Sequence, residues 1–323
     1  MCENLYPTCE VHTDIYCYRF STNDRMKTFG MSRAPGGIGH IAVDLQIPNH
    51  MIVAGRHAIS TTDGSLSTQI IAGSRVAGYR EGVASQARFH TVSGFFQLSP
   101  LAVIVLDRFN HCLRLIDRFS GATGPFVGQC SKSGYGDGTA AMFDEPYDII
   151  RDTTQENRFF VSDRAINAIR ITDLSNRNVS TLIKSDQIPK PKGMAYDADS
   201  GSLYIIASCG VVMYNIQRRS LSVIVSSSSA GFADGSLTDT RMYYPKEIVL
   251  LSSTQLLVSD PNNHRLRILD LITNTASSVC SGKRGYYDEN LLKCNLGTPW
   301  SIHLNNSKLY FGDRKIIRMV EGK

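Results

Sequence analysis

The sequence contains no long hydrophobic run. Its longest apolar stretches, residues 101–106 and 248–251, have the length of a strand, whereas about 18 apolar residues in a row are needed to cross a membrane. Charge is scarce as well, because charged residues make up 20% of the chain and no block of five or six like charges occurs. The net charge of +5 is therefore spread thinly, which gives little support to a dedicated nucleic-acid binder. We expect an ordinary globular protein without a membrane span.

Several catalytic and metal-binding motifs are also missing. No CxxC pair occurs, which excludes a zinc ribbon and a thioredoxin motif. Nothing resembles a nucleophile elbow or an HExxH helix. Any enzymatic function would therefore have to come from residues that the fold brings together.

Cysteine is present in an even number that permits full pairing in many connectivities. Three cysteines within the first 17 residues suggest a small N-terminal segment tied by disulfides. Cys280 and Cys294 lie on either side of one predicted loop and are plausible partners. The alternative is eight reduced thiols in a cytosolic protein. The cysteines are Cys2, Cys9, Cys17, Cys112, Cys130, Cys209, Cys280 and Cys294.

Two signals about the compartment disagree. Asn178 and Asn305 begin N-x-S sequons in predicted turns, which suits a secreted glycoprotein. The segment after Met1 is polar and holds no signal peptide. The chain is either a processed fragment of a secreted protein, which we favour, or cytoplasmic with Met1 as its native start.

A short pattern recurs along the chain. An aspartate is followed three or four residues later by an asparagine, and then by a hydrophobic residue and an arginine. Each copy follows a β-rich run, and each full copy precedes another short β segment. The copies are Asp107/Asn110/Arg114, Asp163/Asn167/Arg170, Asp260/Asn263/Arg267 and a shortened one at Asp313 and Arg318.

A second pattern precedes the β-rich runs: a glycine, an aromatic residue, a spacer, a hydrophobic anchor and often a proline. It is clearest at residues 134–146 and 231–245. Each unit spans about 45 to 54 residues and holds four short strands joined by glycine-rich turns. A unit of this kind is typical of one propeller blade. We expect an all-β, six-bladed β-propeller of four-stranded blades, because radial repetition lets a single domain reach this length.

These residues resemble the NHL repeat family, in which an Asp-x-x-Asn-x-x-Ile/Leu-Arg signature follows a β-strand in each blade. The resemblance spans residues 38–322 but is uneven. The unit at residues 51–59 has lost the aspartate, and the unit at residues 203–210 has lost all three signature residues. The resemblance implies the fold and leaves the function open, since such propellers serve as adhesion modules, RNA binders, hydrolases and lyases.

Closure of the ring requires a strand from the N-terminal part of the chain. The chain ends after residues 316–320, which would be the third strand of the sixth blade. Residues 15–20 have the β character to supply the missing strand, and pairing there would protect an exposed edge. We therefore divide the chain into a cysteine-rich arm at residues 1–14 and a propeller at residues 15–323.

The first strand of every blade in a propeller lines the channel along its axis. Alignment on the hydrophobic anchor plus five residues predicts six such positions, at intervals of 54, 54, 45, 54 and 54 residues. His40, Asp148 and Glu247 occupy alternate positions, and small residues occupy the others. One imidazole and two carboxylates could hold a divalent cation such as calcium or zinc, for which axial sites in six-bladed lactonase-like hydrolases and amidating lyases give a precedent. The alternative is that these are ordinary polar side chains in a wet channel.

Other polar and aromatic residues have plainer interpretations. We expect the repeated arginines to make salt bridges or carbonyl contacts between blades. Trp300, which follows Pro299 near the channel mouth, is expected to pack rather than to hold a ligand. Basic loops after the second strands could form a polyanion-binding face or scattered solvated charges. Their residues are Arg108, His111, Arg164, His264, Arg265, Arg314 and Lys315.

Three functions remain open. We favour a binding module that presents one face of the ring to a protein or glycan partner, because of the N-terminal cysteines, the sequons and the lack of a convincing catalytic set. The first alternative is a metal-dependent hydrolase or lyase at the channel mouth, whose cation would activate water and polarise a substrate carbonyl. The second is RNA binding through the basic loop face, which would weaken steeply with salt.

Overall fold

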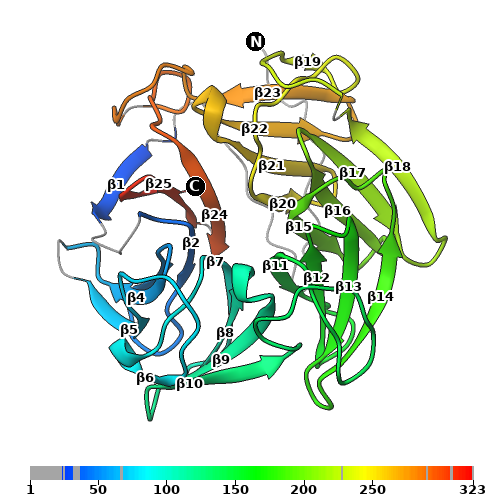
Figure 1. The fold of residues 1–323 in the computed structure, drawn as a ribbon. Helices are drawn as coiled ribbons and strands as arrows, with labels where there is room; N and C mark the ends of the chain where they lie inside the picture. The colour runs from blue at the N-terminus through cyan, green and yellow to red at the C-terminus, as the bar shows by residue number, and fades with distance from the viewer. Residues whose placement is uncertain are drawn as a thin grey trace.

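The computed structural model describes residues 24, 26–31, 37–65, 68–226, 228–288, 290–305 and 308–321. These residues form six antiparallel sheets arranged around one axis (Figure 1). The described residues contain no α-helix and therefore no helix that could span a membrane. Three single turns of 3-10 helix occur at η1 (Ala84–Gln86), η2 (Arg108–Asn110) and η3 (Pro261–Asn263). The predicted all-β, six-bladed propeller is confirmed.

Five blades are built from consecutive strands, and the first strands of neighbouring blades contact one another around the axis. Blade 1 holds β2 (His40–Val43), β3 (Met51–Ala54), β4 (Ala58–Thr62) and β5 (Gln69–Gly73). Blade 2 holds β7 (Val92–Ser99), β8 (Ala102–Asp107), β9 (Cys112–Asp117) and β10 (Ala122–Val127), with β6 (Gly82–Val83) beside β10. Blade 3 holds β11 (Pro146–Arg151), β12 (Arg158–Asp163), β13 (Ala168–Asp173) and β14 (Asn178–Lys184). Blade 4 holds β15 (Pro191–Asp197), β16 (Ser202–Ala207), β17 (Gly210–Asn215) and β18 (Ser220–Val225). Blade 5 holds β20 (Ile248–Ser252), β21 (Gln255–Asp260), β22 (Arg265–Asp270) and β23 (Thr275–Val279), with β19 (Gly235–Ser236) beside β23.

Blade 6 joins the two ends of the chain. Its strands β24 (Pro299–Asn305), β25 (Lys308–Asp313) and β26 (Ile316–Glu321) are completed by β1 (Met26–Met31), with Met26 opposite Val320. An N-terminal strand therefore closes the ring, as predicted, and that strand is residues 26–31. Residues 15–20, which we expected in this role, lie outside the described residues, as does the predicted arm at residues 1–14.

The hydrophobic core lies between the blades. Residues 103–106 of β8 and 159–161 of β12 are fully buried, which explains why the second strands read as continuous apolar runs and not as alternating ones. One core cluster combines Ile104 and Leu106 of blade 2 with Phe159 and Val161 of blade 3. Since neighbouring blades share their cores, each blade depends on the ring for burial of its apolar faces.

The repeated signature forms a buried network that fixes the segments between blades. The fully buried Arg114 donates to Asp107 at 3.1 Å and to the carbonyl oxygens of Arg88 and Arg80 at 2.7 and 2.8 Å. Asp107 also accepts the backbone N–H of His90 at 2.7 Å. Equivalent ion pairs and carbonyl contacts surround the other three, Arg170, Arg267 and Arg318. The structural role expected for these arginines is confirmed.

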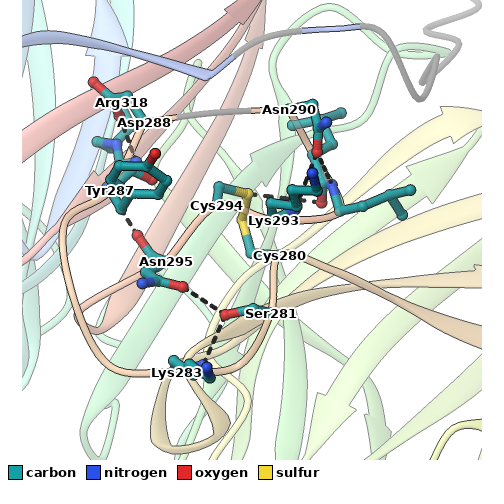
Figure 2. Close-up of a disulfide and its surroundings, with 12 residues drawn as sticks. Cys280, Ser281, Lys283, Tyr287, Asp288, Asn290, Lys293, Cys294, Asn295 and Arg318 are labelled. Carbon is teal, nitrogen blue, oxygen red and sulfur yellow. Dashed lines mark hydrogen bonds and ion pairs between the residues drawn. A yellow bond between two sulfur atoms is a disulfide. The ribbon is translucent and has the colours of Figure 1, made fainter.

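Among the described residues, two disulfides tie loops to this framework. Cys280 is joined to Cys294, the pair suggested by the sequence, and Cys112 is joined to Cys130, a pair that the sequence did not single out. Figure 2 shows the first of these in the loop between blades 5 and 6, where Ser281 donates to Asn295. Ion pairing of Asp288 with the signature residue Arg318 attaches the same loop to β26 (Figure 2).

The remaining sequence features are only partly described. Cys209 is half-buried and forms no disulfide, whereas Cys2, Cys9 and Cys17 lie outside the described residues. Asn178 is exposed at the start of β14, which leaves its sequon accessible. Asn305 is half-buried at the end of β24, and Ser307 of its sequon lies outside the described residues.

Candidate ligand site at the mouth of the ring

The first strands of all blades begin at one face of the ring, which we call the mouth face. Because the strands are antiparallel, the loops after the second strands emerge at the same face. The signature aspartates hold the segments that lead into the first strands of the blades. Asp163 and Asp260 accept the backbone N–H groups of Asp144 and Tyr243, each at 2.7 Å. The next residue then has a positive φ of 49–68° in four blades, at Thr91, Glu145, Lys190 and Tyr244. This conformation is uncommon for residues other than glycine, and it gives the segments that lead into these four blades a similar sharp turn.

A β-bulge follows this turn. In β11, Pro146 and Asp148 lie opposite the consecutive residues Asp163 and Ser162 of β12, so Tyr147 has no partner on that strand. The same register shift leaves Ser93 of β7 and Trp300 of β24 without a partner, and it recurs in β15 between Pro191 and Met194. Bulges re-aim side chains and are common beside functional sites. In blades 3, 4 and 6 they affect the residue after the repeated proline, which is Tyr147, Lys192 and Trp300. Lys246 follows the corresponding proline in blade 5.

The predicted axial residues follow directly after these positions, and the structure brings two of them together. His40 Nδ1 lies 3.3 Å from Glu247 Oε2, although they belong to blades 1 and 5. Asp148 accepts the backbone N–H groups of Met194 at 2.9 Å and Ile149 at 2.8 Å, which links blade 3 to blade 4. Gly193 is required at its position, because a Cβ there would lie 2.7 Å from the carbonyl oxygen of Lys246.

Burial and mutual charge perturb the axial groups. Burial raises the pKa of Asp148, and the nearby charge of Glu247 adds to it, so that the value is about 7. Burial alone would lower the pKa of His40, but its hydrogen bond to Glu247 and the charges of Glu247 and Asp148 raise it. His303, two residues beyond the axial Ser301, has its pKa lowered to about 4 by burial and by the charge of His40.

The metal-binding role of His40, Asp148 and Glu247 stays a prediction. Among the described residues, no group of three or more His, Cys, Asp or Glu side chains is placed so that it could hold a metal ion. Two of the three side chains pair with each other, and the third binds backbone N–H groups. As placed, these residues do not fit a divalent cation. Elemental analysis of the parent and the Asp148→Ala/Glu247→Ala variant tests the prediction.

Lys246 lies at the centre of a cluster of aromatic side chains from several blades. Its Nζ is 4.4 Å from the centre of the Tyr244 ring, 4.8 Å from that of Trp300 and 5.5 Å from that of Tyr147. It also donates to Tyr147 Oη at 3.1 Å. Lys246 therefore reaches from blade 5 to side chains of blades 3 and 6, with 8% of its surface exposed.

Lys192 adds a second buried amine beside the same ring. Its Nζ lies 4.2 Å from the centre of Tyr244 and donates to the carbonyl oxygens of Ser208 and Pro245, each at 2.9 Å. Only 2% of Lys192 is exposed. Burial lowers the pKa of Lys192 to about 8; the nearby Cys209 opposes this effect, and the charges of Arg164 and Lys190 add to it.

Two arginines complete the basic cluster. Arg108 and Arg164 both pair with Glu145, at 3.2 Å from Nε of the first and 2.7 Å from Nη1 of the second. Burial, followed by the charges of Lys192, Arg108 and Arg164, lowers the pKa of Lys246 to about 7. Like charges gathered in a partly buried place cost free energy, and such arrangements are concentrated at functional sites. We call the set Arg108, Glu145, Tyr147, Arg164, Lys192, Tyr244, Lys246 and Trp300 the mouth cluster.

The basic loop residues do not form one uniform face. Arg108 and Arg164 meet at Glu145, but Arg265 stacks on Phe232 with its guanidinium carbon 3.8 Å from the ring centre. His111 pairs with Asp144 at 3.2 Å, and His264 bonds to the carbonyl of Gly297. Trp300 is 43% exposed and its ring contacts Lys246, and the expectation that it packs rather than holds a ligand stays a prediction. The bulge turns it away from the core, which Ile302 of the same strand enters instead.

Lys192, Lys246 and Tyr147 were not singled out by the sequence. Alignment of the blades drew attention to the axial position, where charged residues alternate with small ones. The available signal was one residue earlier, directly after the proline that recurs at residues 146, 191, 245 and 299. A bulge at that place depends on the pairing with the second strand, which the sequence of the first strand does not report.

Comparison with solved structures places the chain among the β-propellers. An auxiliary nutrient-binding protein from Bacteroides thetaiotaomicron matches with a TM-score of 0.67 and 14% identity over 92% of this chain and 76% of that chain. A chain of a nidogen/laminin complex matches with a TM-score of 0.55 and 13% identity over 82% and 85%. A gluconolactonase from Xanthomonas campestris matches with a TM-score of 0.61 and 9% identity over 100% and 99%. At these identities the likeness shows the fold alone.

No family model and no curated protein sequence matches the chain. The protein is thus a six-bladed β-propeller whose axis ends, at the mouth face, in a basic and aromatic cluster.

Proposed function

We propose that the chain is an NHL-type propeller that works as a binding module and presents its mouth face to a protein or glycan partner. We favour a glycan that carries acidic groups. The observation that carries the proposal is the gathering of basic side chains from blades 2 to 5 beside exposed aromatic rings, namely Arg108, Arg164, Lys192 and Lys246 with Tyr244 and Trp300.

Charge and shape of the cluster support an acidic partner. Its basic groups outnumber its one carboxylate, Glu145, and this arrangement attracts anions and raises their rate of encounter. Tyr244 and Trp300, which are 42% and 43% exposed, offer flat apolar surfaces with polar edges. A sugar presents both a C–H face and polar groups, so an acidic glycan fits both parts of the cluster.

An extracellular setting suits this function. The disulfides Cys112–Cys130 and Cys280–Cys294 are of the kind that persists in oxidising compartments. The exposed Asn178 provides an acceptor for N-glycosylation at a site remote from the mouth face, beside the β13–β14 turn. A secreted binding module with these features is part of the proposal.

Binding to immobilised polysaccharides tests the proposed function. We expect the protein to bind polygalacturonate and heparin and not the neutral polymer dextran, measured by biolayer interferometry at several salt concentrations. The Arg108→Gln/Arg164→Gln variant should bind the acidic polymers at least tenfold more weakly, because it removes two charges from the mouth face.

The matched control is Arg218→Gln/Arg219→Gln, which removes two exposed charges from the turn between β17 and β18 on the opposite face. Its binding should equal that of the parent. Equal losses in both variants would mean that net charge alone drives binding and would contradict the proposal. Tighter binding to single-stranded RNA than to either acidic polysaccharide would favour the RNA alternative instead.

A further inference from the structure

The two buried lysines of the mouth cluster have hydrogen-bonding capacity that the protein does not use. An ammonium group carries three N–H donors. Among the described residues, Lys246 has one hydrogen-bond partner, Tyr147 Oη, and Lys192 has two, the carbonyl oxygens of Ser208 and Pro245. Three donors of two nearly buried amines therefore remain for a ligand. Buried polar groups are rarely left without partners unless a function requires it.

The same lysines also lack a neutralising carboxylate. Glu145 is shared by Arg108 and Arg164, and Glu247 pairs with His40. Within the described part of the chain, no acidic side chain forms an ion pair with Lys192 or Lys246. A bound anion would supply the missing negative charge and accept the remaining donors in one step.

The aromatic surroundings indicate what the anion is attached to. Both amines lie over the ring of Tyr244, and Lys246 also lies over Trp300. Each of these two residues keeps more than 40% of its surface exposed. A ligand whose charged group reaches the amines would therefore place its adjoining atoms against exposed aromatic surface, where a flat, apolar face is favoured.

We infer that the two lysines and the two exposed aromatic residues form a subsite for the carboxylate of a uronic acid unit. The inference rests on the proposed function and assigns the acidic group and the residues that bind it. A carboxylate is favoured over a phosphate because the two amines are nearly buried and a phosphate brings more charge that must lose its water. The nearby guanidinium forks of Arg108 and Arg164, which could hold either anion, are already occupied by Glu145.

Ligand-observed NMR titration with single sugars tests the subsite. We expect D-glucuronate to bind the parent protein and D-glucose, which lacks the carboxylate, not to bind. Lys246→Met should weaken glucuronate binding about tenfold or more, the effect of losing a charge-assisted hydrogen bond. Trp300→Ala should weaken it as well, through the loss of the aromatic surface.

Lys315→Met is the matched control, because Lys315 is an exposed lysine of the same face, in the turn between β25 and β26. It should bind glucuronate like the parent. Circular dichroism and the thermal midpoint establish that the Lys246→Met variant is folded. Equal binding of glucose and glucuronate, or undiminished binding by folded Lys246→Met, would overturn the subsite.

Two further outcomes separate this inference from the proposed function. Tighter binding of uridine 5′-monophosphate than of glucuronate would assign the amines to a phosphate and overturn the uronate subsite. Absence of glucuronate binding, together with retained binding of polygalacturonate that depends on Arg108 and Arg164, would overturn the subsite alone. Loss of polymer binding to the mouth face would contradict the proposed function, on which the subsite rests.

Discussion

The mouth cluster depends on a small number of residues that act against their usual tendencies. Lysine is rarely buried, yet Lys192 and Lys246 are 2% and 8% exposed. Tryptophan is highly buried on average, yet Trp300 is 43% exposed. Residues that break such rules without an evident structural gain are concentrated at functional sites. The sequence alone pointed to the axial residues, which are conspicuous by charge, and it missed amines whose burial only the fold reveals.

An ion pair on the face of the ring opposite the mouth face connects blade 1 to blade 2. Arg118 donates to both carboxylate oxygens of Asp44, at 2.6 and 2.8 Å, and Thr61 donates to the same carboxylate. Burial alone would raise the pKa of Asp44, but Arg118 and the other donors hold it below the ordinary value. Folding thus keeps Asp44 ionised at a lower pH than the unfolded chain does.

This ion pair makes stability depend on pH in a defined direction. Because the folded pKa of Asp44 is lowered, its contribution is fully present above the ordinary value of 3.8 and is lost as the pH falls through the folded value. We expect Asp44→Asn to lower the free energy of unfolding by about 1–3 kcal/mol at pH 7 and by less at pH 3. Urea denaturation at both pH values measures this. The control is Asp199→Asn, at an exposed aspartate, which should change the free energy of unfolding little at either pH. If Asp44→Asn lowered the free energy of unfolding equally at both pH values, the proposed role of the ion pair would be contradicted.

Among the elements, the loops between blades differ in how they are held. Each signature arginine fixes one such segment by hydrogen bonds to its carbonyl oxygens, as Arg318 does for Tyr287 and Asn295. The loop between blades 5 and 6 has the Cys280–Cys294 disulfide in addition (Figure 2). This loop leads into β24, the strand that carries Trp300, so its order bears on the mouth cluster.

Removal of this disulfide should loosen the loop. The bond closes a loop of 14 residues in sequence separation, for which a stabilisation of about 2–4 kcal/mol is typical. We expect Cys280→Ser/Cys294→Ser to lower the free energy of unfolding by roughly that amount, measured by urea denaturation without reductant. Cys209→Ser, which removes a cysteine outside the two disulfides, should leave stability unchanged. Equal stability of the double variant and the parent would show that the bond does not constrain the unfolded chain.

At the scale of the elements, the sequence predicted the blades but not the position of the closing strand. The β-rich runs, the recurring aspartate and the glycine-aromatic pattern were enough to predict blades, because each reflects local structure repeated many times. The closing strand was placed too early, at residues 15–20, although an N-terminal strand was expected. The segment Met26–Met31 contains a glycine and two polar residues, so its sequence alone predicts a strand only weakly. It forms β1 because β26 offers it an edge, which is a tertiary effect that outweighs local propensity.

At the scale of the whole molecule, the ring makes distant parts of the chain interdependent. Met26 of β1 is buried in a core cluster with Leu257 of blade 5 and Phe311 of blade 6. The N-terminal strand β1 thus completes the burial of a blade that lies far from it in sequence. The same closure brings the axial residues and the mouth cluster from separate blades into one place.

Weakening of the closing strand should therefore lower the stability of the whole ring. We expect Met26→Ala to lower the free energy of unfolding by about 2–5 kcal/mol, the usual cost of such a cavity, and to speed hydrogen exchange in β26. Val223→Ala on β18, where Val223 is 63% exposed, is the control and should have little effect. Unchanged exchange in β26 of the Met26→Ala variant would mean that β1 does not hold the ring closed.

The register of β1 against β26 also determines how the molecule would respond to a mechanical load. Met26 lies opposite Val320 and Met31 opposite Ile316, so the start of the first strand and the finish of the last strand are side by side. A force that separates these two points acts across the ladder and breaks its hydrogen bonds one after another, as in opening a zipper, whereas a shearing load would strain all of them together. A propeller tethered through both ends would thus yield at blade 6 under modest tension, and the other five blades would still be paired at that moment.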